Sequence, residues 1–202
     1  NLLPFDWQAL KRYGLSLFTL KWLLLRYSQA RSFKKASGTI FLTQYAQDIT
    51  LKITGRLAGK KIIVAHGLDQ RFFIPPRKQK KLAEYNAAKP FRFIYVSTIE
   101  PYKHQWNVVE AVANLKKEGL PVALDLYGSA YSIALKKLNK TIQKVDPDQT
   151  FIKYHGLANH ENLQEKYIKS DMAVFASSCE TFGQILIEGM AAGLPTACSN
   201  IS

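Results

Sequence analysis

The sequence has few cysteines and no long apolar run. Its two cysteines, Cys179 and Cys198, match neither a CxxC motif nor a zinc-ligand spacing, so a disulfide framework or a zinc site is not expected. No secretory signal is visible at the start of the chain. The apolar stretch from Leu15 to Leu25 is interrupted by Lys21 and is shorter than the roughly 20 residues that a bilayer requires. We therefore expect free thiols, a reducing compartment and no transmembrane span.

Acidic residues are scarce in the first half of the chain. Up to Lys89 there are 17 Lys and Arg residues but only 4 Asp and Glu residues, whereas each sign occurs 11 times from Pro90 onward. The net charge of +13 therefore comes from the first half. This half is expected either to face an anionic partner, such as a lipid surface, nucleic acid or a phosphorylated substrate, or to be a solvated basic surface.

Regular alternation of apolar and helical segments in the second half predicts a parallel sheet. Parallel neighbours require crossovers, and right-handed helical crossovers place helices on both faces, as in a doubly wound, Rossmann-like domain. The hydrophobic content of 47% is sufficient for a buried core. Strands are expected at 91–97, 121–128, 150–156, 172–177 and 195–199, and helices at 105–117, 133–145, 161–170 and 183–193.

The first half has a similar but less complete pattern. A long or kinked helix is expected over 7–35, with Gly14 as the break, followed by a buried strand at 38–43, a helix from 44 to Gly55 or Gly59, and a strand at 61–67. The segment 68–90, with its Pro-Pro pair and run of cations, is typical of an interdomain linker. The predicted organisation is therefore 1–67 as part of one Rossmann-like domain, 68–90 as linker, and 91–202 as a second domain truncated at its end.

Two carboxylates bracket an apolar helix near the end of the chain. In SSCETFGQILIEGMAAGLP, Glu180 precedes the aromatic-glycine turn and Glu188 lies about five residues into the helix, about 8 Å along its axis. Gly183 lets the backbone approach a ligand closely, and the unpaired N–H groups of the helix start attract an anion such as phosphate. A diphosphate seated there leaves one acid facing each substituent, and ionised carboxylates accept hydrogen bonds from vicinal hydroxyls.

This segment resembles a known signature. ETFGQILIEGMAAGLP is similar to the E-x7-E motif of retaining GT-B glycosyltransferases of the group 1 (family 4) class, and VSTIEPYKHQWNVVEA resembles the first strand and loop of the family's second domain. The STIEPYKHQ form resembles that of bacterial mannosyltransferase-like members, with Ser97 and His104 in place of two glycines. The resemblance covers the linker and the second half of the chain, and it implies an α/β fold of GT-B type, with a nucleotide-sugar-binding domain preceded by part of the acceptor-side domain.

The resemblance also implies a role for each residue of a donor site. Glu180 would position the donor sugar through its hydroxyls without acting as a covalent nucleophile, and Lys103 would be the cation that stabilises the leaving diphosphate, so these two are the catalytic candidates. Thr98 stands where many members have an arginine that grips the diphosphate. The other donor-binding candidates are the backbone amides of Phe182, Gly183 and Gln184 for the sugar and diphosphate, Glu188 for the ribose, and Leu157 and Asn159 in the loop that contacts the base.

The function implied is transfer of a hexosyl unit, such as mannosyl, from a GDP- or UDP-sugar to a glycan or lipid-linked glycan, with retention of anomeric configuration. No cofactor and no metal are expected, and His66, His104, His155 and His160 have no ligand spacing. The expected place is the cytoplasm, with peripheral attachment to the inner face of the cell membrane. Two alternatives remain: a non-catalytic sugar-nucleotide-binding protein, and a basic nucleic-acid-binding protein, for which no recognised motif occurs.

The apolar and basic segment from Ala9 to Ala36 has two interpretations. Its aromatic and leucine side chains, flanked by cations, suit an anionic lipid interface. Its cations are also spread around the helical wheel, which favours a helix packed in the core with basic ends.

Overall fold

The computed structural model describes residues 2–14, 16–75, 78 and 80–200, which form two compact units. The first unit contains residues 2–67 together with Ser178–Gln184, and the second contains Leu68–Ser177 together with Ile185–Asn200. Both units combine helices with parallel strands, which confirms the expected α/β fold class. Pro76, Arg77 and Gln79 of the expected linker lie outside the described residues.

The second unit is built on a parallel sheet that runs in the order β5-β4-β3-β6-β7. The chain starts in the middle at β3, proceeds outward through β4 to β5, and then returns to the other side of β3 for β6 and β7. This is the doubly wound order of a Rossmann-like domain, as expected. The strands are β3 (Phe91–Val96), β4 (Val122–Tyr127), β5 (Ile152–Tyr154), β6 (Met172–Phe175) and β7 (Thr196–Cys198), and the helices are α4 (Gln105–Lys117), α5 (Ser132–Val145), α6 (Leu163–Ile168) and α7 (Gln184–Ala191).

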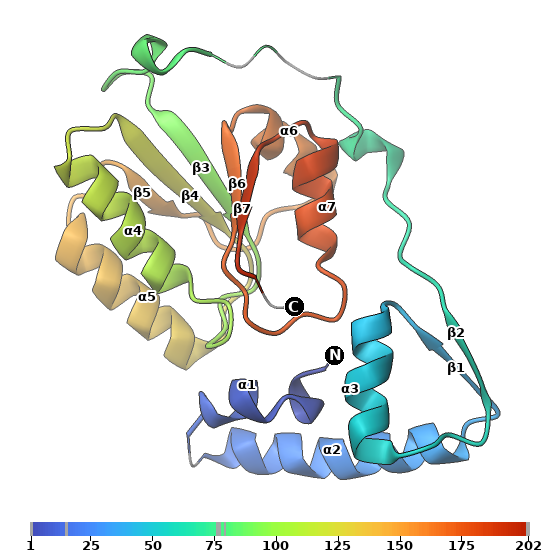
Figure 1. The fold of residues 1–202 in the computed structure, drawn as a ribbon. Helices are drawn as coiled ribbons and strands as arrows, with labels where there is room; N and C mark the ends of the chain where they lie inside the picture. The colour runs from blue at the N-terminus through green and yellow to red at the C-terminus, as the bar shows by residue number, and fades with distance from the viewer. Residues whose placement is uncertain (1, 15, 76–77, 79, 201–202) are drawn as a thin grey trace. The chain divides into compact units, whose positions relative to one another are not determined.

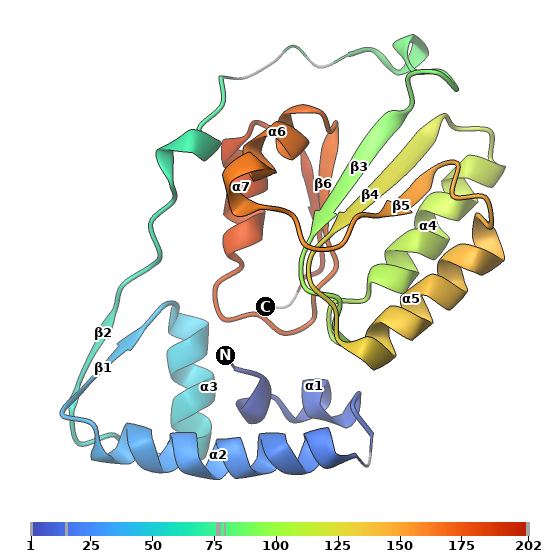
Figure 2. The same cartoon turned by 180° about the vertical axis from the view of Figure 1, so that it is seen from behind.

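Helices cover both faces of this sheet. Figures 1 and 2 show α4 and α5 against one face and α6 and α7 against the other. Successive residues of a strand point to opposite faces, so β3 contributes Tyr95 to the core under α4 and α5, and Ile94 and Val96 to the core under α6 and α7. Burial on both faces explains why these strands are almost continuously apolar in the sequence.

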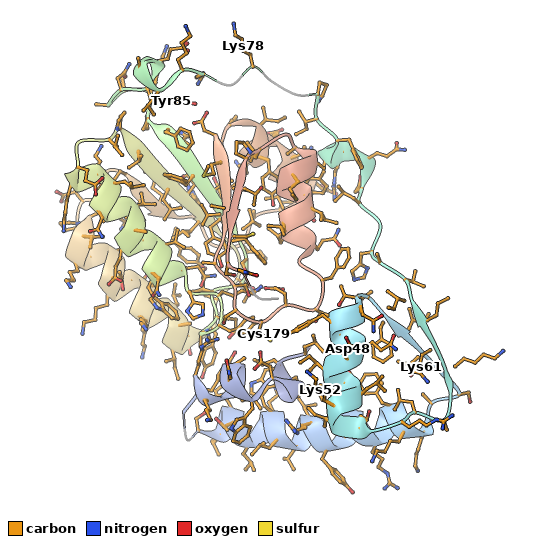
Figure 3. All side chains as sticks on the ribbon, in the orientation of Figure 1. Asp48, Lys52, Lys61, Lys78, Tyr85 and Cys179 are labelled. Carbon is orange, nitrogen blue, oxygen red and sulfur yellow. The ribbon has the colours of Figure 1, made fainter. Side chains whose placement is uncertain are left out.

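A buried tyrosine fastens the chain to the amino end of this sheet. Tyr85, labelled in Figure 3, follows a short 3-10 helix at Leu82–Glu84 and packs edge-to-face on Phe91, with ring centroids 5.1 Å apart. Its hydroxyl donates to Asp171 Oδ1 at 2.9 Å, and the other carboxylate oxygen accepts from the backbone N–H of Arg92 at 2.8 Å. The start of β3 and the start of β6 are therefore joined by one carboxylate.

Asp146 organises the turn between α5 and β5. Burial of this side chain raises the pKa of its carboxyl, but hydrogen bonds from the backbone N–H groups of Phe151, Thr150 and Ile152 and from the Thr150 hydroxyl outweigh that effect and hold the pKa below its ordinary value. Hydrogen bonds to the ionised form favour that form. The turn is therefore held by a charged carboxylate.

Among the described residues of the first unit, two α-helices precede the first strand. These are α1 (Trp7–Lys11) and α2 (Leu17–Lys35), and the break expected at Gly14 is confirmed, since this glycine has a left-handed φ of 63°. Ser16 caps α2 through its side chain, which accepts a hydrogen bond from the Thr19 N–H. No residue of α2 is buried in the described structure, so the prediction that this helix is packed in a core is not met.

A pair of parallel strands completes the first unit. They are β1 (Gly38–Phe41) and β2 (Lys60–Ile63), joined by α3 (Gln44–Thr54). The prediction of a buried strand at 38–43 is wrong for the described residues, because only Phe41 of β1 is buried and β2 is exposed throughout. The physical reason is that the sheet has two strands among the described residues, too few for a helical layer to cover both faces.

Candidate donor site

The strand order of the second unit reverses between β3 and β6. These strands are neighbours, but the chain leaves them in opposite directions across the sheet, which is the topological switch point at which doubly wound proteins bind ligands. The loop after β3 runs from Ser97 to His104, and the chain after β6 continues through Ser177. Residues of these two connections are therefore the first candidates for a site.

Lys103 lies at this switch point. Its side chain is largely buried, with 8% of the residue exposed, and its Nζ atom is 5.0 Å from the ring centroid of Phe175, the last residue of β6. The ammonium also lies 5.3 Å from the ring of Tyr102. Aromatic faces attract cations at these distances, so the two rings hold the charge at the carboxyl end of β6.

Thr98 lies in the same loop and is exposed. Its hydroxyl is 3.2 Å from that of Ser129, in the loop after β4, and the Ile99 N–H donates to the Ser129 carbonyl at 2.7 Å. The loops that follow β3 and β4 are therefore tied to one another along this edge of the sheet.

The start of the loop after β5 is held by contacts of His155. His155 Nε2 is 2.7 Å from Asp125 Oδ1, and its ring stacks on Tyr127 with centroids 4.5 Å apart and planes 9° apart. Leu157 beyond it is 79% exposed. Asn159 is engaged locally, since its Oδ1 accepts from the Glu161 N–H at 3.0 Å. The structure thus places both residues on an exposed loop at the carboxyl edge of the sheet.

Glu188 is buried on α7, with 2% of the residue exposed. The hydroxyl of Tyr167, on α6, donates to its Oε2 at 3.5 Å. Burial, and secondarily the negative charge and hydrogen bond of Glu188, raise the pKa of Tyr167 far above its ordinary value. Tyr167 therefore remains a neutral donor to this carboxylate.

The segment Ser178–Gln184 is held by residues of the first unit. The hydroxyl of Thr43 donates to the Thr181 carbonyl at 3.0 Å, and Phe182 packs edge-to-face on His66 with ring centroids 5.4 Å apart. Gln184 Nε2 donates to the carbonyl of Gly67 at 3.4 Å. Figure 3 labels Cys179, which belongs to this segment and is buried.

Within this segment Glu180 is partly buried. Gly183 is buried and has a φ of 83°, a conformation that favours glycine at the turn into α7. The structure thus groups Glu180, Phe182, Gly183 and Gln184 with the first unit, and Thr98, Lys103, Leu157, Asn159 and Glu188 with the second.

Three residues near these candidates were not found from the sequence. Tyr95 and Gln105 bond to the loop that carries Lys103, and Tyr167 bonds to Glu188. Tyr95 and Tyr167 have the pattern of ordinary core residues, and Gln105 that of a polar residue at the start of a helix. No signal in a single sequence identifies the backbone carbonyl or carboxylate that each one contacts.

A pocket lined by residues of the first unit does not have the chemistry of a diphosphate site. It has a volume of about 520 Å³, and no ionisable side chain lines it; residues such as Phe5, Phe33 and Phe41 do. Among the described residues there is no group of three or more His, Cys, Asp or Glu side chains that could hold a metal ion. In that same part of the chain, no helix is both long and apolar enough to cross a bilayer. Neither Cys179 nor Cys198 forms a disulfide bond within the part of the chain that the structure describes.

Comparison with protein families identifies the family of this chain. Residues 76–202 match the family described as Glycosyl transferases group 1. The chain belongs to this family. The matched range contains all nine residues that the sequence predicted for the donor site, and it confirms the group 1 glycosyltransferase assignment made from the motifs.

Two curated glycosyltransferases are similar to this family member. The GtfA subunit of the UDP-N-acetylglucosamine–peptide N-acetylglucosaminyltransferase of Streptococcus pneumoniae is 30% identical over 107 residues, which are 53% of this chain and 20% of GtfA. The O-antigen chain mannosyltransferase B of Escherichia coli is 27% identical over 124 residues, which are 60% of this chain and 32% of the relative. The chain thus matches only a third or less of the length of each relative.

A solved structure shows the same fold. HepE of Anabaena, crystallised in complex with UDP and glucose, superposes with a TM-score of 0.67 at 19% sequence identity, over 93% of this chain and 49% of HepE. At this identity the likeness concerns the fold alone. The group 1 chain therefore has the α/β architecture of GT-B glycosyltransferases, as the motifs implied.

Proposed function

We propose that the protein binds a nucleotide-diphosphate sugar and transfers its hexosyl unit to a glycan or lipid-linked glycan. The observation that carries this proposal is the buried ammonium of Lys103 at the switch point between β3 and β6, in a chain of the group 1 glycosyl transferase family. A largely buried cation in a fixed position is suited to the charge that develops on a departing diphosphate.

The proposed roles of the other residues follow from their chemistry. The backbone N–H groups of Phe182, Gly183 and Gln184 open α7, and together with Lys103 they would bind the diphosphate. Glu188, a carboxylate already held by one hydroxyl donor, would accept from the ribose, and Glu180 would position the donor sugar. Thr98 would add a hydroxyl beside the diphosphate, and Leu157 and Asn159 would contact the base.

Several finer features belong to the same proposal. The donor would be a UDP- or GDP-sugar. HepE was crystallised with UDP and glucose, which supports UDP, and the Escherichia coli relative is a mannosyltransferase, which keeps mannosyl among the candidate units. Transfer would retain the anomeric configuration through an oxocarbenium-like state. Lys103 and the start of α7 would stabilise the leaving group, so that the reaction needs neither a metal nor a cofactor.

A panel of UDP-, GDP- and ADP-sugars in a thermal-shift assay tests donor binding. At saturation, the matching nucleotide sugar is expected to raise the melting temperature of the wild type by about 5–10 °C. Glu188→Ala removes the proposed ribose contact and is expected to lose most of this shift. Met190→Ala, a change at an exposed residue of the same helix, should retain it.

The shift is measured for each variant relative to its own unliganded form, so a loss of stability from the buried substitution does not enter the result. If no nucleotide sugar stabilises the wild type, or if Glu188→Ala retains the full shift, the assignment of this carboxylate is wrong. Binding without any transfer by the complete protein would favour a non-catalytic sugar-nucleotide-binding protein, which Thr98 in place of an arginine permits.

We further propose that the protein is cytoplasmic and binds peripherally to the inner face of the cell membrane through α2. This helix contains no acidic residue and exposes large apolar side chains, with Leu17 84%, Leu24 64% and Tyr27 70% exposed. Apolar side chains interspersed with cations suit the boundary between headgroups and acyl chains of an anionic leaflet.

Vesicle co-sedimentation tests this placement. The protein is expected to bind vesicles that contain phosphatidylglycerol but not vesicles of phosphatidylcholine alone. Leu24→Glu should weaken binding about tenfold, because an exposed leucine that would enter the membrane is lost and a negative charge is gained. Ile133→Glu, at an exposed apolar residue of α5, is the matched control and should leave binding unchanged. Equal binding of both variants would exclude α2 as the contact.

A further inference from the structure

Two buried side chains close the loop that carries Lys103. Tyr95, on β3, is 1% exposed, and its hydroxyl donates to the carbonyl of Lys103 at 2.5 Å. Gln105, the first residue of α4, is fully buried, and its Nε2 donates to the carbonyl of Thr98 at 3.0 Å. Both interactions therefore join a buried side chain to a backbone carbonyl of the loop.

The two hydrogen bonds cross one another along the chain. Tyr95 precedes the loop but holds its last part, at Lys103, whereas Gln105 follows the loop but holds its first part, at Thr98. The end of the loop is therefore bonded to the strand before it, and the start of the loop to the helix after it. Neither end of the loop can move away without breaking one of these two hydrogen bonds. A further bond, from the Lys103 N–H to the Glu100 carbonyl at 3.0 Å, closes the turn inside the loop.

This closure matters because of the side chain that the loop carries. A lysine ammonium sits on a flexible four-carbon stem, so its position depends on how firmly its backbone is held. With the Lys103 carbonyl fixed by Tyr95, the stem runs inward and places Nζ 5.0 Å from the ring of Phe175, on the neighbouring strand of the switch point. A charge positioned before the ligand arrives needs no reorganisation when negative charge develops.

The amide of Gln105 costs stability in the core, which indicates that its hydrogen bond serves the loop. Its Oε1 is buried and has no hydrogen-bond partner among the described residues. A buried acceptor without a partner is unfavourable, and an apolar side chain of similar size would avoid this cost. The Nε2 atom of this buried side chain donates to the loop, at the carbonyl of Thr98. The neighbouring His104 adopts a left-handed φ of 55°, which completes the sharp turn from the loop into α4.

We infer that Tyr95 and Gln105 are positioning residues for Lys103: their crossed hydrogen bonds hold the loop closed and keep the ammonium ready for the diphosphate of the donor. This inference rests on the proposed function, since it assigns the two residues to the diphosphate part of that site. Neither residue touches the donor in this assignment, and both act through the backbone of the loop.

The test compares nucleoside diphosphates with nucleosides. Tyr95→Phe removes only the hydroxyl, and Gln105→Met removes the amide at similar length. Binding of UDP and GDP is measured by titration calorimetry, and binding of uridine and guanosine by ligand-detected NMR. Loss of one hydrogen bond is expected to weaken binding of the preferred diphosphate about 3- to 10-fold in each variant. The matching nucleoside lacks the diphosphate that Lys103 is proposed to bind, so its affinity should change by less than about twofold.

A double substitution shows whether Tyr95 acts by positioning Lys103 or by a general effect on the structure. In a Lys103→Ala background, Tyr95→Phe is expected to cause little further loss of diphosphate affinity, because the group that it positions is absent. Tyr85→Phe is the matched control: it removes a buried tyrosine hydroxyl bonded to Asp171 at the other end of the sheet, and it should leave the preference for diphosphate over nucleoside unchanged.

The outcomes distinguish this inference from the proposed function. If the wild type binds UDP or GDP but the variants bind it equally well, or if diphosphate and nucleoside are weakened to the same extent, the positioning role is overturned and the proposed function stands. If the wild type binds no nucleoside diphosphate, the proposed function fails, and the inference fails with it.

Discussion

Lys103→Ala is expected to slow sugar transfer by about 10²- to 10³-fold, the typical effect of losing one preorganised group that stabilises developing charge. The reason is the place of this cation: it is largely buried at the switch point and lies against Phe175. If the donor breaks down through an oxocarbenium-like state, most of the new negative charge appears on the diphosphate. The measurement is the turnover rate of the complete protein with the nucleotide sugar that the thermal-shift panel identifies.

Lys117→Ala is the control for a change of net charge. This lysine lies in the last turn of α4, is exposed, and carries the same charge away from the switch point. Its removal should leave turnover within about twofold of the wild type, since exposed charges contribute little. Lys103→Arg is expected to restore only part of the rate, because a planar guanidinium and a compact ammonium differ in geometry. A Lys103→Ala variant with wild-type turnover would remove Lys103 from the mechanism.

The secondary structure of the second unit could be predicted because several features of its sequence favour the same helices and strands. The helix expected at 105–117 is found at Gln105–Lys117, and the strand expected at 91–97 at Phe91–Val96. In both cases apolar periodicity, flanking turn residues and strand length favour the same element. The first unit lacked this agreement. GTIF is a short apolar run, and such a run does not reveal whether neighbouring elements cover it. In the structure, only Phe41 of β1 is buried.

Part of the candidate donor site could also be predicted from the sequence. Glu188 was singled out as a charge in an apolar helix, and the structure buries it beside Tyr167. His104 stands where the motif that this segment resembles has a glycine. Its φ of 55° is in the left-handed region that favours glycine, and histidine is among the residues that tolerate this region. Tyr95 and Gln105 could not be found, because their partners are backbone carbonyls in a loop whose conformation follows from tertiary structure.

The carboxyl edge of the sheet also depends on Gly128, and Gly128→Ala is expected to destabilise the protein by about 3–5 kcal/mol. A methyl group at this position would lie 2.0 Å from the carbonyl oxygen of Ser97 and 2.5 Å from its carbon, both backbone atoms that cannot rotate away. The φ of 143° is also a conformation that residues with a Cβ rarely adopt. Gly128 further donates its N–H to the Gly156 carbonyl at 2.8 Å, so it lies where the loops after β3, β4 and β5 meet.

Gly119→Ala separates the two causes of the lost stability, which are the steric clash of the added methyl group and the strain of a positive φ. Gly119 also has a positive φ, 87°, but a methyl group there would meet no atom within 4 Å, so only the backbone strain of about 1 kcal/mol is expected. The expected decrease in melting temperature is about 10 °C for Gly128→Ala and about 3 °C for Gly119→Ala, measured by differential scanning calorimetry. Because Ser97 opens the loop that carries Lys103, the Gly128 variant should also bind the nucleoside diphosphate more weakly, while the Gly119 variant should not. Equal melting temperatures for the two variants would show that the carboxyl ends of β3 and β4 are not packed as closely as the structure has them.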